Sequence, residues 1–335
     1  MTDDPARFGV WYDFRNPEPW ALPYETLYRQ NLDQIEWAET LGYGSVWLSE
    51  HHFCEDGYTP SPLVIAGAVG ARTRSMVIGT NLLLLPLHDP IRVAEDSAIL
   101  SIMTGGRFDL GVAIGYREEE FYGFRRDLSK RPSTIEEGAE ILRRAWSGEP
   151  VSFEGKRFSV PDVRVTPAPQ HVPQLLMGGM SQPAVDRVAR IADGFLCAVP
   201  GHLPMYLEAL AKTGADPAQG RAYVGEWAIV DEDPERMWAE VGDHALYQVN
   251  NYIRWGAFGD LTPFEHRDEV VAAGMYQLWD AATAVKELTT LLSDWPQIKD
   301  VYFWARLPGE SIETSSRRVE YLAAQVLPEV RSRVA

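Results

Sequence analysis

Cysteine and basic residues are scarce in this sequence, and it contains no long apolar run. Two cysteines, Cys54 and Cys197, cannot form a disulfide framework and lack the spacing of metal ligands. No apolar stretch approaches the roughly 20 residues that span a bilayer. Lysine and arginine number 31 against 48 aspartates and glutamates, a net charge of −17. Nucleic acid and anionic membranes both need a basic face, so neither is expected as a partner.

Two kinds of signal are also missing. The N-terminal stretch MTDDPARFGVWYDF has neither the basic nor the apolar region of a signal peptide, so a cytoplasmic location is expected. No GxGxxG fingerprint follows a predicted strand, so no dinucleotide-binding unit for a nicotinamide is predicted. Any redox chemistry in this protein would therefore need electrons supplied by another protein.

Apolar strands alternate with amphipathic helices along the chain. Eight such repeats predict an α/β fold, a closed (β/α)₈ TIM barrel. A length of 335 residues alone would allow two domains, but the unbroken alternation favours one domain over residues 1–335. The predicted strands are 8–14, 44–49, 77–85, 108–114, 174–177, 194–199, 223–230 and 301–305, and the helices include 24–40, 63–72, 91–103, 133–146, 182–191 and 316–327, with another beginning at 204.

Insertions interrupt this alternation in two places. Residues 151–160 (VSFEGKRFSV) alternate around a Glu-Gly pair, which predicts a β-hairpin before the fifth strand. A segment from 231 to 299 separates the seventh and eighth strands and contains the glycine- and aromatic-rich patch 250–265. Long loops of this kind are often lids, so we expect this patch to be mobile. In the fourth repeat, Ser133 and Glu136 predict a capping box at the start of a helix.

A polar cluster follows the second predicted strand directly. In the run GSVWLSEHHFCEDG the apolar residues stop at Glu50, His51 and His52. Ligands of parallel α/β folds bind beyond the carboxyl ends of the strands, so these three side chains are well placed for chemistry. A lone histidine there would more often satisfy a buried hydrogen bond, whereas the three together favour a functional site.

Several separated segments resemble the bacterial luciferase family of flavin-dependent monooxygenases. They are VWLSEHHF, LLPLHDPIRVAEDSAILSIMTGGRFDLGVAIGYREEEF, PQLLMGGMSQPAVDRVARIADG and the closing VLPEVRS, which together cover nearly the whole chain. The resemblance implies a (β/α)₈ barrel that binds reduced FMN, or in one branch a deazaflavin coenzyme, at the carboxyl ends of the strands. It also implies a homodimer.

The resemblance assigns roles to particular residues. His51 matches the histidine that luciferases use as an acid/base group beside the flavin, and Glu50 and His52 flank it; a structural role for His52 remains open. Arg131 lies within one position of an arginine on the flavin phosphate, although a surface salt bridge is its alternative. The phosphate-binding turn is matched by Gly178, Gly179, Met180 and Ser181. Such a turn before a helix presents backbone N–H groups and the helix dipole to an anion.

The resemblance also places backbone beside the flavin ring. Luciferases carry a non-prolyl cis peptide at the step matching Asn81–Leu82, so we predict one there. Ala113 replaces a reactive cysteine that luciferases hold beside the flavin, and Ile114 and Asp89 replace a phosphate-contacting arginine and a second active-site histidine. These departures exclude light emission from the expected activity and keep the deazaflavin alternative open. Residues expected to line the cofactor or substrate pocket are Trp11, Phe53, Tyr58 and Tyr116.

The function that follows is a two-component monooxygenase. Reduced FMN from a separate NAD(P)H:flavin reductase and O₂ would oxidise a largely apolar organic substrate, whose identity the sequence does not give. The alternatives are a deazaflavin-dependent oxidoreductase that transfers hydride without O₂, and a non-catalytic flavin-binding protein. A metal-dependent hydrolase using His51, His52 and Asp56 is disfavoured, because no second histidine cluster is present and no metal is expected.

Overall fold

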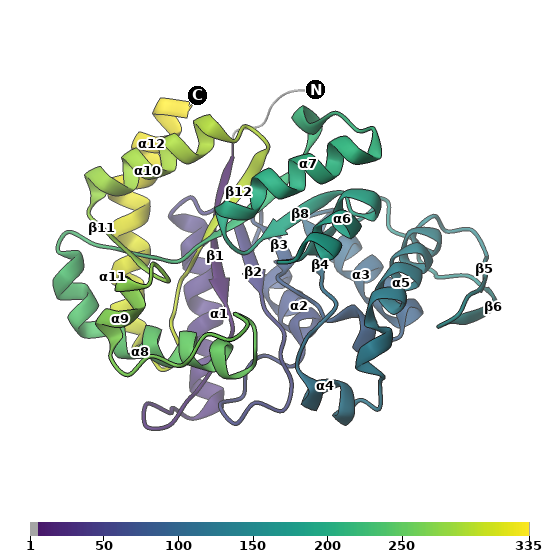
Figure 1. Cartoon of the computed structure of the whole chain (residues 1–335), viewed down its shortest axis with the longest axis horizontal. Coiled ribbons are helices and arrows are strands. Elements are labelled where there is room, and N and C mark those ends of the chain that lie inside the picture. The colour runs from purple at the N-terminus through teal and green to yellow at the C-terminus, as the bar shows by residue number, and fades with distance from the viewer. Residues whose placement is uncertain (1–5, 335) are drawn as a thin grey trace. The chain divides into compact units, whose positions relative to one another are not determined.

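The computed structural model describes residues 6–334, and its centre is a closed barrel of eight parallel strands (Figure 1). Around the barrel the strands follow one another in sequence order, with the first pairing to the last. This confirms the predicted (β/α)₈ architecture. The barrel strands are β1 (Arg7–Tyr12), β2 (Ser45–Leu48), β3 (Val77–Thr80), β4 (Phe108–Val112), β7 (Leu175–Gly178), β8 (Gly194–Cys197), β9 (Ala222–Glu226) and β12 (Ile298–Trp304).

Helices connect successive strands. Helix α3 shows how local sequence sets their bounds: Asp89 accepts hydrogen bonds from the N–H groups of Ile91 and Arg92, Pro90 occupies the first turn, and Gly105 ends the helix with a φ of 66°. The helices are α1 (Tyr24–Thr40), α2 (Pro62–Arg72), α3 (Pro90–Thr104), α4 (Glu118–Gly123), α5 (Arg131–Trp146), α6 (Gln182–Ile191), α7 (Leu203–Thr213), α8 (Pro234–Arg254), α9 (Arg267–Ala272), α10 (Ala281–Asp294), α11 (Ile312–Tyr321) and α12 (Leu327–Val334).

The third strand is shorter than predicted. The regular strand ends at Thr80; beyond it Leu83 still forms one bridge to Val112, and a short 3₁₀ turn follows over Leu85–Leu87. The N–H of Leu84, which a longer strand would give to its neighbour, bonds to the carboxylate of Glu50. The peptide bond between Asn81 and Leu82 is cis, as predicted.

Two predicted helix boundaries are wrong. Helix α5 begins at Arg131, because Pro132 presets the first turn, so Ser133 and Glu136 do not form the predicted capping box. The Ser133 hydroxyl bonds to Lys130 O and Arg157 Nε. The last helix begins at Ile312, where the Ser311 hydroxyl caps it, and a π-helical turn over Leu322–Val326 joins α11 to α12.

Both predicted insertions are present. A two-stranded antiparallel hairpin, β5 (Val151–Glu154) with β6 (Ser159–Val163), precedes β7 as expected. The predicted strand 223–230 is in fact two strands, because the chain leaves the barrel at Trp227, whose carbonyl accepts a bond from the N–H of Gln277. The second of them, β10 (Ala228–Val230), pairs with β11 (Gln277–Trp279) in a separate small sheet.

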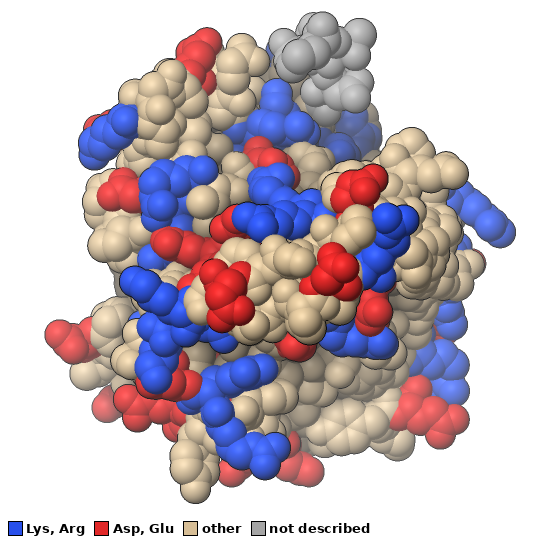
Figure 2. All heavy atoms as spheres, turned by 90° about the vertical axis from the view of Figure 1, so that its right-hand side faces the viewer, with Lys and Arg blue, Asp and Glu red and all other residues tan. Residues whose placement is uncertain are grey.

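Contacts within the chain divide it into two compact units. Unit 1 comprises the chain up to Val46, Cys54–Tyr58 and the chain from Ala222 onward; unit 2 comprises Trp47–Phe53 and Thr59–Arg221. The expectation of a single domain stays a prediction. On the face drawn in Figure 2, described acidic and basic side chains are interspersed, and neither sign covers that face continuously. Between residues 6 and 334, no helix has the length and apolar character needed to cross a membrane.

Candidate functional site

In unit 2, the run after β2 places its side chains in two hydrogen-bonded clusters. The first is centred on Glu50, which is 2% exposed. Its Oε1 lies 3.0 Å from His52 Nε2 and 2.7 Å from His88 Nε2, while its other oxygen accepts the N–H of Leu84. Burial alone would raise the pKa of Glu50, but the charge of His88 and the hydrogen bonds of both histidines lower it to about 2. Glu50 is therefore a carboxylate at neutral pH.

Glu50, His52 and His88 also form a group with metal-ligand character, since one ligand atom from each lies within 4.8 Å of the others. The two histidines, however, already share Glu50 Oε1 through short contacts. Burial lowers the pKa of His88, but the negative charge of Glu50 outweighs it and raises that pKa above its ordinary value. Because both imidazole Nε2 atoms already lie within hydrogen-bond distance of Glu50 Oε1, the group forms a hydrogen-bonded triad.

The second cluster is centred on His51. Its Nδ1 lies 2.7 Å from Glu120 Oε1, and Glu120 is fully buried on the short helix α4. The same carboxylate oxygen accepts the backbone N–H of His52 at 2.9 Å and lies 3.4 Å from Arg117 Nη1. Because a carboxylate only accepts, the proton of a neutral His51 sits on Nδ1. That leaves Nε2, which is 3.3 Å from the hydroxyl of Tyr116, as the atom that can exchange protons.

Backbone from β3 and β4 joins these clusters to the residues predicted at the flavin ring. The N–H of Asn81 bonds to Leu48 O at 2.7 Å, and the N–H of Ala113 bonds to Leu83 O at 2.9 Å. Leu82 is half-buried and faces Gly178 so closely that a Cβ there would lie 2.6 Å from its methyl group. Unit 2 thus brings together the predicted residues of β2, β3, β4 and β7.

The predicted phosphate turn lies directly before α6. Ser181 is the N-cap residue and its side chain makes no capping hydrogen bond. At Gly179 a Cβ would lie 2.7 Å from the Cβ of Ala184, so only glycine lets the turn approach the helix this closely. Met180 and Ser181 are exposed. Within the first turn of α6, Pro183 has no N–H and the N–H groups of Ala184 and Val185 bond to Ser181 O, so the donors that this turn offers an anion are those that precede Pro183.

Arg131 stands at the start of the neighbouring helix, α5. Glu136 of α5 pairs with Arg187 of α6 at 3.0 Å, and further along both helices Arg143 bonds to Ile191 O at 2.9 Å. These two contacts show that the helices run in the same direction, so Arg131 lies at the same end as the phosphate turn. Among residues 6–334 Arg131 forms no ion pair, and its role on the phosphate stays a prediction.

Unit 1 carries a second group of buried polar residues, just after β1. Arg15 is completely buried, and its Nε lies 2.6 Å from Asp56 Oδ2. The same oxygen accepts the hydroxyl of Tyr247 at 3.0 Å. Three rings surround the guanidinium, with centroids 5.1 to 5.2 Å from its carbon, and they belong to Tyr58, Tyr247 and Trp255. We call these residues, with Arg15, the Arg15 cage. Asp56 thus pairs with Arg15 and Tyr247.

Aromatic rings continue from this cage. The Tyr58 and Tyr252 hydroxyls are 2.8 Å apart, and Tyr252 packs on Trp227 with 5.9 Å between centroids. Trp227 in turn contacts Trp11 and Trp304, which are stacked on each other at 3.7 Å. The predicted pocket residues Trp11 and Tyr58 therefore lie on one aromatic surface. Phe53, by contrast, is 61% exposed and packs on Phe124.

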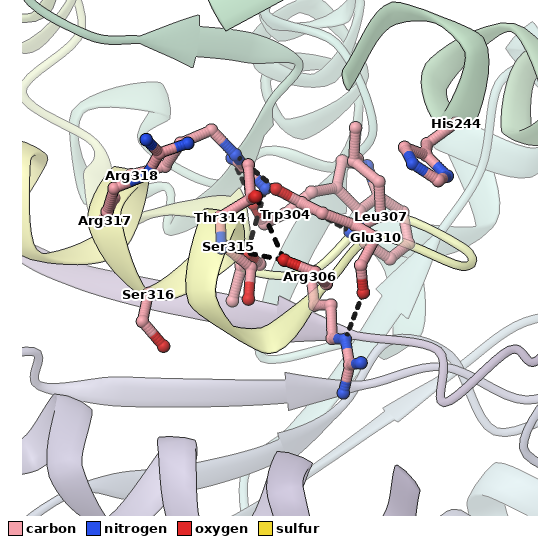
Figure 3. A network of polar contacts seen from close by, with 12 residues as sticks. His244, Trp304, Arg306, Leu307, Glu310, Thr314, Ser315, Ser316, Arg317 and Arg318 are labelled. Carbon is pink, nitrogen blue, oxygen red and sulfur yellow. Dashed lines mark hydrogen bonds and ion pairs between the residues drawn. The ribbon is translucent and has the colours of Figure 1, made fainter. Parts of the chain in front are cut away.

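A dense polar network secures the loop between β12 and α11 (Figure 3). Arg318 uses all of its nitrogens: Nε and Nη2 bind the Glu310 carboxylate, and Nη1 and Nη2 bind the carbonyls of Trp304 and Ala305. Arg306 bonds to Glu310 O and Asn31 Oδ1, each at 2.8 Å. His244 of α8 is tied to the same loop through Pro308 O at 3.0 Å. Every side-chain nitrogen of Arg318 is bonded within this network, which indicates a structural role.

Sequence reasoning missed four residues of these clusters: Glu120, His88, Arg117 and Arg15. Glu120 lies among three consecutive glutamates, and only the fold shows that it is the buried one. Asp89, which stands where luciferases have an active-site histidine, caps helix α3. The residue before it, His88, is a histidine that bonds to Glu50. The signal for both was their position after predicted strands.

Comparison with known proteins gives the chain its relatives. It is 33% identical over 180 residues to an F420-dependent glucose-6-phosphate dehydrogenase of Microbacterium testaceum, a match covering 52% of this chain and 53% of that protein. The chain spans 40% to 53% of the length of the first curated relatives it matches.

Solved structures match over nearly the whole chain. Monooxygenase RslO1 from Streptomyces bottropensis superposes with a TM-score of 0.79 at 22% identity, covering 96% of this chain and 99% of its own. The oxygenating constituent of 3,6-diketocamphane monooxygenase from Pseudomonas putida, solved with FMN, gives 0.79 at 16% identity, covering 97% and 98%. The sequence model of the luciferase-like monooxygenase family matches residues 6–289. The chain therefore belongs to the luciferase-like monooxygenase family.

Proposed function

We propose that this protein is a flavin-dependent monooxygenase that uses reduced FMN and O₂ to oxidise a largely apolar organic substrate. It would act as the oxygenase of a two-component system, with reduced FMN supplied by a separate NAD(P)H:flavin reductase. The observation that carries the proposal is the pairing of His51 with the buried Glu120, which leaves His51 Nε2 next to the Tyr116 hydroxyl. An imidazole held in one tautomer beside a hydroxyl is suited to moving a proton.

The residues of unit 2 fit an FMN. The phosphate would lie on the N–H groups before α6, with Arg131 at the same end of the neighbouring helix, and Asn81, Leu82 and Ala113 would contact the ring. Bound reduced FMN would supply the activation of O₂. Glu50 and His52 would act as positioning residues, since Glu50 fixes the Leu84 backbone and the His52 ring at once.

His51 would accept and return the proton that moves during oxidation. Glu120 favours this role because it keeps Nδ1 protonated and stabilises the imidazolium that forms when Nε2 accepts a proton. Tyr116 extends the path by one hydroxyl. Trp11 and Tyr58 would form apolar walls for substrate, consistent with the aromatic surface on which they lie.

A second candidate is a deazaflavin-dependent oxidoreductase that transfers hydride without O₂. It is favoured by the 33% identity to a protein named as an F420-dependent dehydrogenase and by Ile114 in place of a phosphate-contacting arginine. Fluorescence titration with FMN and with the deazaflavin coenzyme separates the two, since the proposal expects tighter binding of FMN. Preference for the deazaflavin would replace the first candidate by the second.

Stopped-flow mixing tests the chemistry. Reduced FMN and O₂ should react with different kinetics in the presence of the protein, and His51→Ala should remove most of that difference while still binding FMN. The exposed His171→Ala serves as the control. Kinetics identical to those of free reduced FMN would refute the oxygenase proposal. FMN binding with no effect of His51→Ala would indicate a non-catalytic flavin-binding protein.

We also propose that the protein forms a homodimer through α2 and α3. Large apolar side chains are exposed on these helices, with Val64 73%, Met103 59% and Ile99 40% exposed. Arg92 and Asp96 on α3 pair with each other, which balances both charges beside these apolar side chains. Sedimentation should give a dimer at micromolar concentration and a monomer for Val64→Glu combined with Met103→Glu. A monomeric wild type would refute the dimer.

A further inference from the structure

The Arg15 guanidinium has donors that the protein itself does not use. Arg15 is completely buried, yet of its side-chain nitrogens only Nε is bonded, to Asp56 Oδ2. Neither Nη1 nor Nη2 has a hydrogen-bond partner among residues 6–334. Burial alone would lower the pKa of Arg15, but the charges of Asp56 and Asp13 raise it above its ordinary value, so the group is a cation. Buried donors on a cation are almost always paired.

Arg318 shows what a structural arginine looks like in the same unit. It is also completely buried, but all three of its nitrogens bond to Glu310 or to the carbonyls of Trp304 and Ala305 (Figure 3). The network around Arg318 therefore accounts for that residue in full. Asp56 bonds to Nε of Arg15, whereas Nη1 and Nη2 have no hydrogen-bond partner among the described residues.

We propose that Arg15 binds the substrate of this enzyme, and that the substrate carries a carboxylate on an aromatic or otherwise apolar body. The two Nη groups present parallel N–H donors on the guanidinium edge that Asp56 leaves open. Two parallel donors match the two oxygens of a carboxylate, and this bidentate pairing is the strongest that arginine makes. The inference rests on the proposed function only in taking the ligand to be the substrate.

The surroundings of Arg15 fit the apolar part of such a ligand. Tyr58 and Trp255 of the Arg15 cage continue through Tyr252 to Trp227, with centroid distances of 5.6 to 5.9 Å along that path. An acid bound at Arg15 could therefore lay its rings or chain along this surface. Polar groups that fix orientation within largely aromatic walls are the usual composition of a small-molecule site.

Charge at the site allows an anion to bind. Asp13 accepts the backbone N–H of Arg15 at 3.3 Å, and burial raises the pKa of Asp13 to about 7. At neutral pH Asp13 is therefore close to the midpoint of its titration and can take up a proton, while Asp56 forms the ion pair with the guanidinium. An incoming carboxylate adds one negative charge, which protonation of Asp13 would balance.

Trp255 is the cage residue best placed to admit a ligand. It is half-buried at the end of α8, and Gly256 follows it with a φ of 81°. The first half of α8 is tied to other elements, since His244 bonds to Pro308 O and Glu240 pairs with Arg317. Movement of Trp255 therefore needs only the last turn of the helix and the loop after it, which is the patch expected to form a lid.

Calorimetric titration of the full-length protein without flavin tests the proposal. The probes are benzoate and 2-naphthoate, each compared with its neutral amide. In wild type the acids should bind about tenfold or more tightly than the amides, as expected for a charge-assisted bidentate contact. Arg15→Gln should bring acid and amide to equal affinity. Arg15→Lys should lose most of the preference, because an ammonium cannot present two parallel donors.

Arg306→Gln is the matched control, because Arg306 is a buried arginine of the same unit whose bonds to Glu310 and Asn31 are internal. It should keep the acid preference. Equal binding of acids and amides by wild type overturns the proposal without any variant, and so does a preference that survives in Arg15→Gln. Since no flavin is present, failure here leaves the flavin titration independent, and failure of FMN binding leaves this result standing.

Discussion

Replacing His88 by glutamine is expected to destabilise the protein in a pH-dependent way. His88 Nε2 lies 2.7 Å from Glu50 Oε1, and its side chain is 27% exposed. Burial alone would raise the pKa of Glu50. The charge of His88 is the largest effect in the opposite direction, and the pKa falls from 4.5 to about 2. A drop of that size corresponds to ~3 kcal/mol of favourable interaction at neutral pH. His88 makes the largest favourable contribution, so we expect His88→Gln to cost roughly 1.5 kcal/mol of unfolding free energy.

The sign of the pH dependence follows from both partners. The pKa of His88 is raised in the folded protein, because the charge of Glu50 outweighs burial. Its contribution is therefore fully present below its unfolded pKa of 6.5 and is lost as pH rises through the folded value. The contribution of Glu50 is present above 4.5 and is lost as pH falls toward 2. The stability difference between wild type and variant should be largest between these limits.

Urea unfolding followed by tryptophan fluorescence measures this difference. Wild type and His88→Gln should differ most near about pH 5.5 and least near about pH 9. His171→Gln, at an exposed histidine, should show no such trend. A difference between wild type and His88→Gln that is constant across this range would refute the charge-based account of the Glu50 triad.

Three further outcomes are expected. Glu120→Gln removes the carboxylate behind His51, so the effect of the protein on reoxidation of reduced FMN should fall by ~10-fold or more in stopped flow, with FMN affinity unchanged; weaker FMN binding would instead give Glu120 a cofactor role. Gly179→Ala places a Cβ 2.7 Å from Ala184 and should weaken FMN binding by about tenfold in a fluorescence titration, whereas Gly201→Ala, which meets no atom within 4 Å, should not. Asp56→Asn leaves the charge of Arg15 without its ionised partner and should cost ~3 to 5 kcal/mol in urea unfolding. Loss of the exposed Glu240–Arg317 pair by Glu240→Gln should cost ~1 kcal/mol at most, and equal costs would contradict the buried-pair argument.

Much of the fold could be predicted from the sequence because its signals are local. Alternation of apolar strands and helices identified all eight barrel strands, and α6 has the predicted bounds of Gln182–Ile191. Errors arose where a distant partner decides the backbone. Beyond the end of β3 the Leu84 N–H bonds to Glu50, and β10 leaves the barrel to pair with β11. Neither partner is visible in the run of residues concerned.

The same distinction applies to the candidate site. Glu50, His51 and His52 could be found because they are consecutive and follow a strand, and the turn before α6 because its glycines precede a helix. Glu120 and Arg15 could not be found from the sequence. Glu120 stands out because it is buried and bonds to His51 Nδ1, and Arg15 because its two Nη atoms have no hydrogen-bond partner among the described residues. A sequence pattern gives residue types, whereas hydrogen-bond satisfaction is a property of the folded neighbourhood.

Glu50 and His51 are consecutive residues but belong to two separate hydrogen-bonded clusters, and this determines which distant substitutions disturb each of them. Glu50 faces His88 and the backbone after β3, whereas His51 is held from α4 through Glu120. Helix α4 spans only Glu118–Gly123, and beyond it Arg125 already has a φ of 55°. A substitution that displaces α4 would leave Glu50, His51 and His52 unchanged. It would still move Glu120 away from His51 Nδ1, so the imidazole would no longer be held in one tautomer. Under the proposed function, a variant of this protein with an intact histidine motif is therefore expected to be inactive when the turn after β4 is displaced.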